Sequence, residues 1–213
     1  MRRAITKKLA QSSNDLCDAG ENWRHVFHTK LNWLRETFAQ RESIIKKFDP
    51  DVCYDIGAHN GEFSRLLRQI LPNTEIHQFE GSPNKAQKAK VGPWHKTVLS
   101  KEDDARVTFY HDGGTGDTYM RETDQFLKTN YQTTVVKTRR LDTYVDENFL
   151  PYPDFIKIDV QGAELDVLVG CNDILNRCKL IHCEIPAEGI EFNSGSPSQK
   201  EYLDFFKNAG FIH

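Results

Sequence analysis

Two acidic side chains, Asp55 and Glu80, end short apolar runs of the sequence, VCYDI and IHQFE. The first run continues through a small turn from Gly57 to Gly61 into FSRLLRQI, whose apolar residues repeat at helical spacing. Glu80 follows Gly57 by about 20 positions, the spacing at which an acid receives ribose hydroxyls in nucleotide-binding sheets. The two acids therefore predict a nucleoside site at one end of a sheet.

The turn between this strand and helix indicates which nucleoside the site binds. A dinucleotide-binding turn needs GxGxxG so that the backbone approaches a pyrophosphate, whereas here the turn reads Gly-Ala-His-Asn-Gly. A ligand without a pyrophosphate fits this turn, and the negative charge of Asp55 suits a ligand that carries a cation. S-adenosylmethionine has a ribose, a carboxylate, an ammonium and a sulfonium, and we expect it as the cofactor.

A second group of charged side chains lies in FIKIDV, where Lys157 and Asp159 interrupt an apolar run. Residues two apart share one face of a strand, so these two side chains point the same way. Two interpretations of Asp159 remain open: a buried partner of Lys157, or a group beside the methyl acceptor that removes its proton. Asp159 and Glu184 offer carboxylates on neighbouring strands, yet nothing in their spacing requires a metal, and we expect none.

Strand-like runs bounded by turn residues alternate with helical segments along the chain. This alternation predicts an α/β fold with a mostly parallel, doubly wound sheet and helices on both faces. Residues 111–134 are rich in glycine and without clear period, which leaves open a hairpin turn with a linker or a flap over the site. We expect strands at 52–56, 75–81, 96–100, 106–112, 154–162 and 179–186, and helices at 61–71, 83–91, 141–149, 163–176 and 197–209.

The chain divides into three parts. Residues 1–21 predict a polar tail, and residues 22–49 place apolar side chains at steps of three and four, which predicts one amphipathic helix that ends before Pro50. Residues 50–213 form the α/β domain. The sequence stops at NAGFIH, where a final strand only begins, so we expect the last hairpin of the domain to be truncated.

Composition excludes several classes of protein. With 213 residues, of which 38% are hydrophobic, the chain can bury the core of one domain. A net charge of −3 argues against a dedicated nucleic-acid binder. The sequence contains no run of about 18 apolar residues, the length that would predict a membrane span. The 5 cysteines are odd in number and lack a CxxC pair, which predicts reduced thiols in a cytoplasmic protein. We expect either a monomer or a homodimer.

Five motifs in this order, VCYDIGAHNGEFS, HQFEGSP, RRLDTYV, DFIKIDVQGAELDVLVG and HCEIP, resemble the FkbM family of S-adenosylmethionine-dependent methyltransferases. The resemblance covers residues 50–212, and KIDVQGAELDVL is its most specific part. It implies a Rossmann-like class I methyltransferase fold and methylation of a hydroxyl on a sugar or small metabolite. It also implies that the cofactor is bound by Asp55, Gly57, Asn60, Gly61 and Glu80, with Ser100 near the adenine, and it places Asp159, our leading candidate for the catalytic base, at the tip of the fourth core strand.

Two positions depart from the usual sequence of the family. Gln161 stands where DVEGAE has glutamate, so an acid–base role of that glutamate does not carry over, and Gly81 replaces the proline of FEP and changes the turn. Two other functions remain open. One is a non-catalytic scaffold that binds the cofactor without turnover, and the other is a nicotinamide-dependent oxidoreductase, which the missing GxGxxG opposes.

Overall fold

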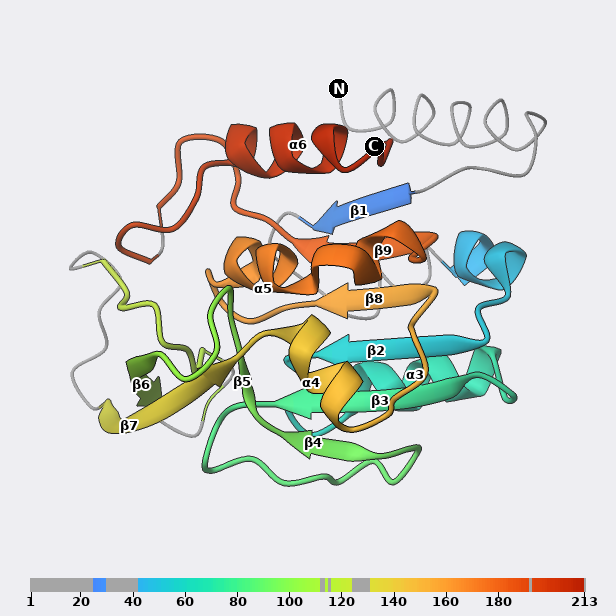
Figure 1. The fold of residues 1–213 in the computed structure, drawn as a ribbon, viewed down its shortest axis with the longest axis horizontal. Coiled ribbons are helices and arrows are strands. Elements are labelled where there is room, and N and C mark those ends of the chain that lie inside the picture. The colour runs from blue at the N-terminus through green and yellow to red at the C-terminus, as the bar shows by residue number, and fades with distance from the viewer. Residues whose placement is uncertain are drawn as a thin grey trace.

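A central parallel sheet organises the structure, which is a computed structural model (Figure 1). The strand order is β1-β9-β8-β2-β3-β4, and every pair in it is parallel. The chain runs outward from β2 through β3 to β4 and then returns to start β8 beside β2, so the topological switch lies between β2 and β8. The structure describes residues 25–29, 42–111, 114, 116–123, 131–191 and 193–212. The strands are β1 (His25–Thr29), β2 (Val52–Ile56), β3 (Glu75–Glu80), β4 (Trp94–Lys96), β8 (Phe155–Ile158) and β9 (Leu180–Glu184).

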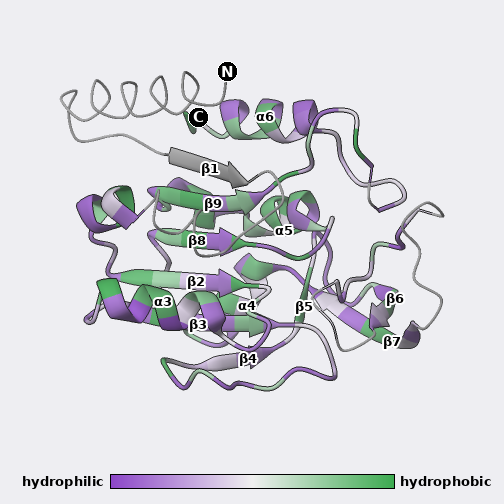
Figure 2. Cartoon of the chain, turned by 180° about the vertical axis from the view of Figure 1, so that it is seen from behind, coloured by the Kyte–Doolittle hydropathy of each residue, from purple (hydrophilic) through white to green (hydrophobic). Residues whose placement is uncertain are grey.

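Helices cover both faces of this sheet (Figures 1 and 2). On one face, Phe63 and Leu67 of α3 pack with Ile76 and Phe155, together with Ile45 from a helical segment at 42–48. On the other face, buried side chains of α4, α5 and α6 pack on β2 and β8 in a larger core. The fold is therefore the doubly wound α/β class predicted from the sequence. The helices are α3 (Glu62–Ile70), α4 (Leu141–Glu147), α5 (Glu164–Cys171), the 3-10 helix η2 (Asn172–Asn176) and α6 (Gln199–Asn208).

A smaller sheet stands beside the carboxyl ends of the central strands (Figure 1). Its order is β5-β7-β6, with β7 antiparallel to β6, so the stretch that starts near His111 connects two strands of a hairpin. The described residues of that connection also bond back to the hairpin, through an isolated bridge between Tyr110 and Thr118. The strands are β5 (Val98–Leu99), β6 (Arg106–His111) and β7 (Gln132–Arg139).

Two predicted elements differ from the structure, and one strand was not predicted. The helix expected over residues 22–49 is wrong at His25–Thr29, because this segment is β1, paired with β9; most of the remainder lies outside the described residues. Pairing with β1 gives the backbone groups along the edge of β9 their hydrogen-bond partners, and these bonds outweigh the helical spacing of the apolar residues. The segment HVFHT is also rich in aromatic and β-branched residues, which favour strands. The helix expected at 83–91 is a loop, and β7 was not predicted.

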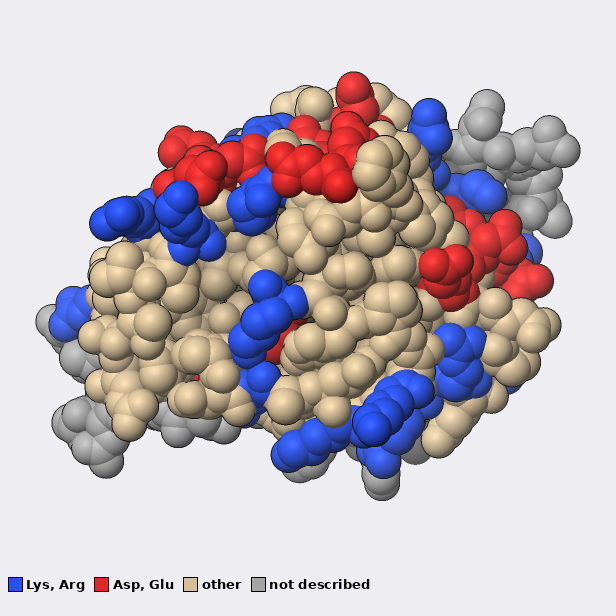
Figure 3. Space-filling view, turned by 60° about the horizontal axis from the view of Figure 1, so that its bottom comes forward, with Lys and Arg blue, Asp and Glu red and all other residues tan. Residues whose placement is uncertain are grey.

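Within the described residues, β1 forms the edge of the central sheet beside β9. The four described cysteines are buried free thiols, as predicted, and Cys17 lies outside the described residues. No described helix is both long and apolar enough to cross a membrane. On the face drawn in Figure 3, basic side chains lie in separate clusters with acidic groups along another edge, so this face has no continuous basic stripe.

Candidate active site

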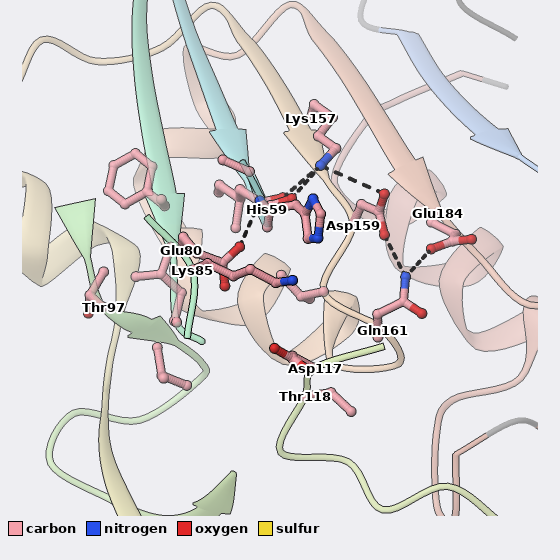
Figure 4. A pocket seen from close by; sticks show the side chains of 18 of the residues that line it. His59, Glu80, Lys85, Thr97, Asp117, Thr118, Lys157, Asp159, Gln161 and Glu184 are labelled. Atoms are coloured by element: carbon pink, nitrogen blue, oxygen red, sulfur yellow. Dashed lines mark hydrogen bonds and ion pairs between the residues drawn. The ribbon is translucent and has the colours of Figure 1, made fainter. Parts of the chain in front are cut away.

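A cavity of about 480 Å³ opens at the carboxyl ends of β2, β3 and β8, beside the topological switch (Figure 4). In α/β sheets ligands bind at this position, because the loops that leave neighbouring strands in opposite directions separate there. Gly57, Glu80 and Asp159, which follow or end these three strands, all line the cavity. The fold therefore brings together three residues that are far apart in the sequence.

The turn after β2 makes a close backbone contact with the end of β8. Gly57 has φ +73°, and a β-carbon at this position would lie 1.8 Å from the carbonyl oxygen of Asp159. The amides of Gly57 and Ala58 both donate to the carbonyl of Phe79, at 2.9 and 3.0 Å. Only glycine fits here, since it tolerates the left-handed conformation and leaves room for the neighbouring strand.

Two carboxylates of the protein accept hydrogen bonds from backbone amides of the turn that precedes α3. The amide of His59 donates to Glu80 Oε2 at 2.7 Å, and the amide of Asn60 donates to Glu62 Oε2 at 3.1 Å. Amides at a helix N-terminus are the groups that hold a phosphate in dinucleotide-binding folds. Because side chains of the chain itself already accept these hydrogen bonds, the turn disfavours a pyrophosphate ligand.

Glu80 is held in one orientation at the end of β3. Its second oxygen, Oε1, accepts a hydrogen bond from the Ser82 amide at 2.7 Å, so each carboxylate oxygen has a backbone donor. Burial raises the pKa of Glu80, and these two hydrogen bonds oppose that shift. Each oxygen retains a further lone pair, which leaves the carboxylate able to accept two hydroxyl groups from a ligand.

Asp55 lies behind the wall of the cavity, and its side chain is completely buried. Ser64 Oγ donates to Oδ2 of Asp55 at 2.6 Å, and the ammonium of Lys157 lies 3.1 Å from Oδ1. Lys157 also donates to the carbonyl of Gly57 at 2.8 Å. Burial acts to lower the pKa of Lys157, but the charges of Asp55 and Asp159 outweigh it and raise that pKa. Asp55 therefore holds the ammonium that fixes the turn.

Asp159 and Glu184 face each other across the side chain of Gln161 (Figure 4). The amide nitrogen of Gln161 donates to Asp159 Oδ1 at 2.8 Å and to Glu184 Oε2 at 3.1 Å. Burial, together with the charge of Asp159, raises the pKa of Glu184. Burial also acts to raise the pKa of Asp159, but the Lys157 charge and hydrogen bonds from Glu184 and Gln161 hold it below its ordinary value. Near neutral pH, Glu184 keeps the proton and Asp159 carries the charge.

Three carboxylates, those of Asp159, Glu164 and Glu184, have ligand atoms within 4.8 Å of one another. The hydrogen bonds around them fit proton sharing better than a cation. The oxygens of Glu164 accept from the amides of Val160 and Gly162, and the amide nitrogen of Gln161 donates toward the other two carboxylates. A donor N–H directed at the centre of such a group opposes a metal ion there.

The comparison with known protein families identifies the domain that contains this site. A family model described as the methyltransferase FkbM domain matches residues 55–212. The chain belongs to the FkbM methyltransferase family. The sequence resemblance is thereby confirmed, and the domain includes every cavity residue discussed above.

The chain is also similar to a curated protein that is named as a methyltransferase. The chain is 31% identical over 161 residues to a protein named 2-O-methyltransferase NoeI from Sinorhizobium fredii (strain NBRC 101917 / NGR234). The matched stretch covers 67% of this chain and 65% of that relative, so it falls just short of two thirds of the relative's length. No solved structure matches the chain.

The remaining predicted cofactor residues of the FkbM domain lie around the cavity but not among its lining residues. Gly61 precedes α3 with φ +86°, and the amide of Asn60 binds Glu62. Ser100 is buried, and its hydroxyl accepts a hydrogen bond from Tyr119 at 3.0 Å. A cofactor contact for these residues and for Asp55 stays a prediction.

Several lining residues of the FkbM domain were not singled out in the sequence. Asp117, Thr118 and Tyr119 come from the stretch that was left open between a linker and a flap. Val98 and Phe109 come from the smaller sheet. The signal that locates the first group is a glycine-rich connection next to a predicted site, but nothing in the spacing indicates which of its side chains reach the cavity.

Proposed function

We propose that this chain transfers a methyl group from S-adenosylmethionine to a hydroxyl oxygen of a sugar or other small metabolite. The observation that carries this proposal is the pair of preorganised carboxylates in one cavity. Glu80 is fixed by two backbone amides, and Asp159 is held by Lys157 and Gln161. When bound, the cofactor supplies a methyl group on a positively charged sulfur.

The residues present fit this cofactor by the chemistry of their donor and acceptor groups. The Glu80 carboxylate accepts vicinal hydroxyls, in charge-assisted hydrogen bonds. Val98, Phe109 and Tyr119 provide apolar and aromatic surface for a base in the same cavity. Two amides of the turn before α3 are occupied by carboxylates of the protein, which disfavours a pyrophosphate there and favours an adenosyl ligand over a dinucleotide.

Asp159 is the proposed acceptor of the hydroxyl proton. Its lowered pKa keeps it charged at neutral pH, with Lys157 Nζ at 3.7 Å and the Gln161 amide at 2.8 Å fixing its two oxygens. A base in this position accelerates a reaction by about 10²- to 10⁴-fold. Alignment of the two reactants contributes more, on the order of 7 to 11 kcal/mol, so the rigid strand ends have the larger effect.

The name of the curated relative supports a hydroxyl oxygen as the acceptor atom, because that protein is named as a 2-O-methyltransferase. For this chain the acceptor is part of the proposal. The four buried free thiols in turn support a reducing, cytoplasmic location.

Titration calorimetry with S-adenosylmethionine, its demethylated product S-adenosylhomocysteine and NAD tests the proposal. We expect both adenosyl ligands to bind in the micromolar range, about 8 kcal/mol, and NAD not to bind. Binding of NAD alone would indicate an oxidoreductase. Adenosyl binding without methyl transfer to any of a panel of hydroxylated acceptors would indicate a scaffold.

A further inference from the structure

A second cavity, of about 120 Å³, adjoins the first on the far side of the Asp159 group. Gln161 and Glu184 line both cavities, so these two side chains form the boundary between them. Asp159 lines the larger cavity only, and the side chain of Gln161, which donates to it at 2.8 Å, separates it from the smaller one. Nothing in the methyl-transfer site described above uses this second space.

Two loops that are distant in the sequence close over the smaller cavity. Glu122 and Asn193 form an isolated antiparallel bridge, and both line the cavity. Asn193 Nδ2 donates to the carbonyl of Met120 at 2.9 Å, and the amide of Ser194 donates to the carbonyl of Arg121 at 2.7 Å. These hydrogen bonds join the loop after β6 to the loop after β9, and together the two loops form one wall of the cavity.

The polar groups on this wall are mostly hydrogen-bond acceptors. Oε2 of Glu122 is buried and has no hydrogen-bond partner among the described residues. The two side-chain amides on the wall already donate to protein acceptors, Gln161 to two carboxylates and Asn193, with one of its two N–H groups, to Met120. A ligand that satisfies this wall must bring its own donors, which hydroxyl and ammonium groups do.

The charge of the wall points in the same direction. Its described lining includes Glu122, Glu164 and Glu184 and no lysine or arginine. A phosphate or carboxylate group offers acceptors only and would enter a partly buried space whose described lining has no lysine or arginine to balance its charge, which costs free energy on both counts. An uncharged polyol or an amino alcohol avoids both costs.

We propose that the smaller cavity is the acceptor subsite and that it takes the hydroxyl-bearing edge of an uncharged or cationic sugar, to the exclusion of anionic sugars. Its volume corresponds to about four water molecules, which is room for part of one sugar ring. The reacting hydroxyl points past the boundary formed by Gln161 and Glu184 toward Asp159 in the larger cavity, and neighbouring hydroxyls donate to Glu122. The inference rests on the proposed methyl transfer.

Ligand-observed saturation-transfer NMR on the full chain, saturated with S-adenosylhomocysteine, tests this subsite without turnover. The probes are methyl glucopyranoside, its 2-amino-2-deoxy analogue and methyl glucuronide, which differ only in charge and one substituent. We expect the first two to bind at least about tenfold more tightly than the glucuronide, the effect of one charged contact. Equal binding of the glucuronide, or no binding of any probe, would overturn the assignment.

Variants on the wall locate the binding. Ser196→Trp should fill the cavity and abolish the probe signals, whereas Ser43→Trp, at an exposed position on the opposite face of the sheet from α6, should leave them unchanged. Glu122→Gln should reduce the discrimination against the glucuronide several-fold, at an unchanged melting temperature. Unaltered signals in Ser196→Trp, or unaltered discrimination in Glu122→Gln, would contradict the proposal.

Calorimetry with S-adenosylhomocysteine on the same preparations separates the two proposals. If wild-type protein fails to bind this ligand, the proposed function fails. If the ligand binds normally but the sugar probes do not behave as expected, only the acceptor subsite fails.

Discussion

The ammonium of Lys157 lies 3.1 Å from Oδ1 of Asp55, and both side chains are buried on neighbouring strands, where they are register partners. This ion pair sits directly beneath the turn at Gly57, because Lys157 also donates to its carbonyl. The pair thus connects the interior of the sheet to the shape of the larger cavity. The cost of breaking this ion pair, measured as a loss in the free energy of unfolding, depends on its burial more than on the distance between the charges.

Lys157→Met should reduce the free energy of unfolding by about 3 to 5 kcal/mol, because it leaves the buried carboxylate of Asp55 without a counter-charge. The matched control is Lys137→Met, which removes an exposed ion pair with Asp104 at 2.8 Å and should cost about 1 kcal/mol or less. Urea unfolding measures both. Similar losses in the two variants would show that burial of the Lys157 pair has no special weight.

Asp159→Asn should retain the fold and the cofactor affinity but lower methyl transfer by about 10²-fold or more. Lys157 keeps Asp55 as its nearer partner, at 3.1 Å against 3.7 Å for Asp159, so removal of the Asp159 charge leaves the ammonium paired. Melting temperature, calorimetry and turnover are measured on one preparation. Wild-type turnover would remove Asp159 from the catalytic group, and a large loss of stability would assign it a structural role.

Glu80→Gln should weaken cofactor binding and also lower stability, by about 1 to 3 kcal/mol. The amide retains one acceptor oxygen, so one of the backbone donors, His59 or Ser82, loses its partner. Glu188→Gln, at an exposed position, controls for the loss of a carboxylate. An unchanged unfolding free energy in Glu80→Gln would mean that water or the new amide satisfies both donors.

Gly57→Ala should destabilise the protein by about 3 kcal/mol or more, because the new methyl group meets the backbone of Asp159. Gly189 offers a matched control, since its φ is +75° against +73° for Gly57 but nothing lies within 4 Å of its β-carbon position. Gly189→Ala should therefore cost only the backbone strain, about 1 to 2 kcal/mol. Equal losses would contradict the close contact between the ends of β2 and β8.

The carboxyl group of Glu164 predicts a pH dependence of stability. Burial raises its pKa to about 7 from an ordinary value of 4.5, so the folded chain retains a proton that the unfolded chain has lost. The contribution of this group is fully present below pH 4.5 and is lost as the pH rises through 7. Glu164→Gln does not titrate at this position and removes the effect.

Urea unfolding at several pH values measures this contribution. The stability of the wild type relative to Glu164→Gln should fall by about 3 kcal/mol between pH 4.5 and pH 8, at about 1.4 kcal/mol for each unit of pKa shift. The exposed Glu188→Gln variant should show no such trend. A difference that is independent of pH would mean that Glu164 is ionised in the folded protein throughout this range.

The sequence predicts the parts of this fold that depend on local patterns. The strand, turn and helix at residues 52–70 are present as expected, because apolar spacing and glycine requirements act within a short stretch. The pairing of Lys157 with Asp159 also follows from strand periodicity, at 3.7 Å. The prediction fails at β1, where pairing with β9, distant in the sequence, decides the structure.

The cavity lining could be predicted only in part for the same physical reason. Gly57, Glu80 and Asp159 are found from sequence because each stands at the end of a strand, and parallel strands end at one edge of the sheet. Tyr119 and Glu122 reach the two cavities through a loop whose course depends on contacts with distant segments, such as the bridge to Asn193. No local pattern encodes such contacts.

The backbone contact between Gly57 and Asp159 has a consequence for redesign of the chain. It fixes the spacing between the ends of β2 and β8, and neither loop on the wall of the smaller cavity takes part in this contact. Under the proposed function, exchanging the segments around Glu122 and Asn193 should therefore alter which molecule enters without changing the alignment of the reacting atoms. Substrate range and catalytic alignment would then be separately adjustable, with the two loops as the starting point for redesign.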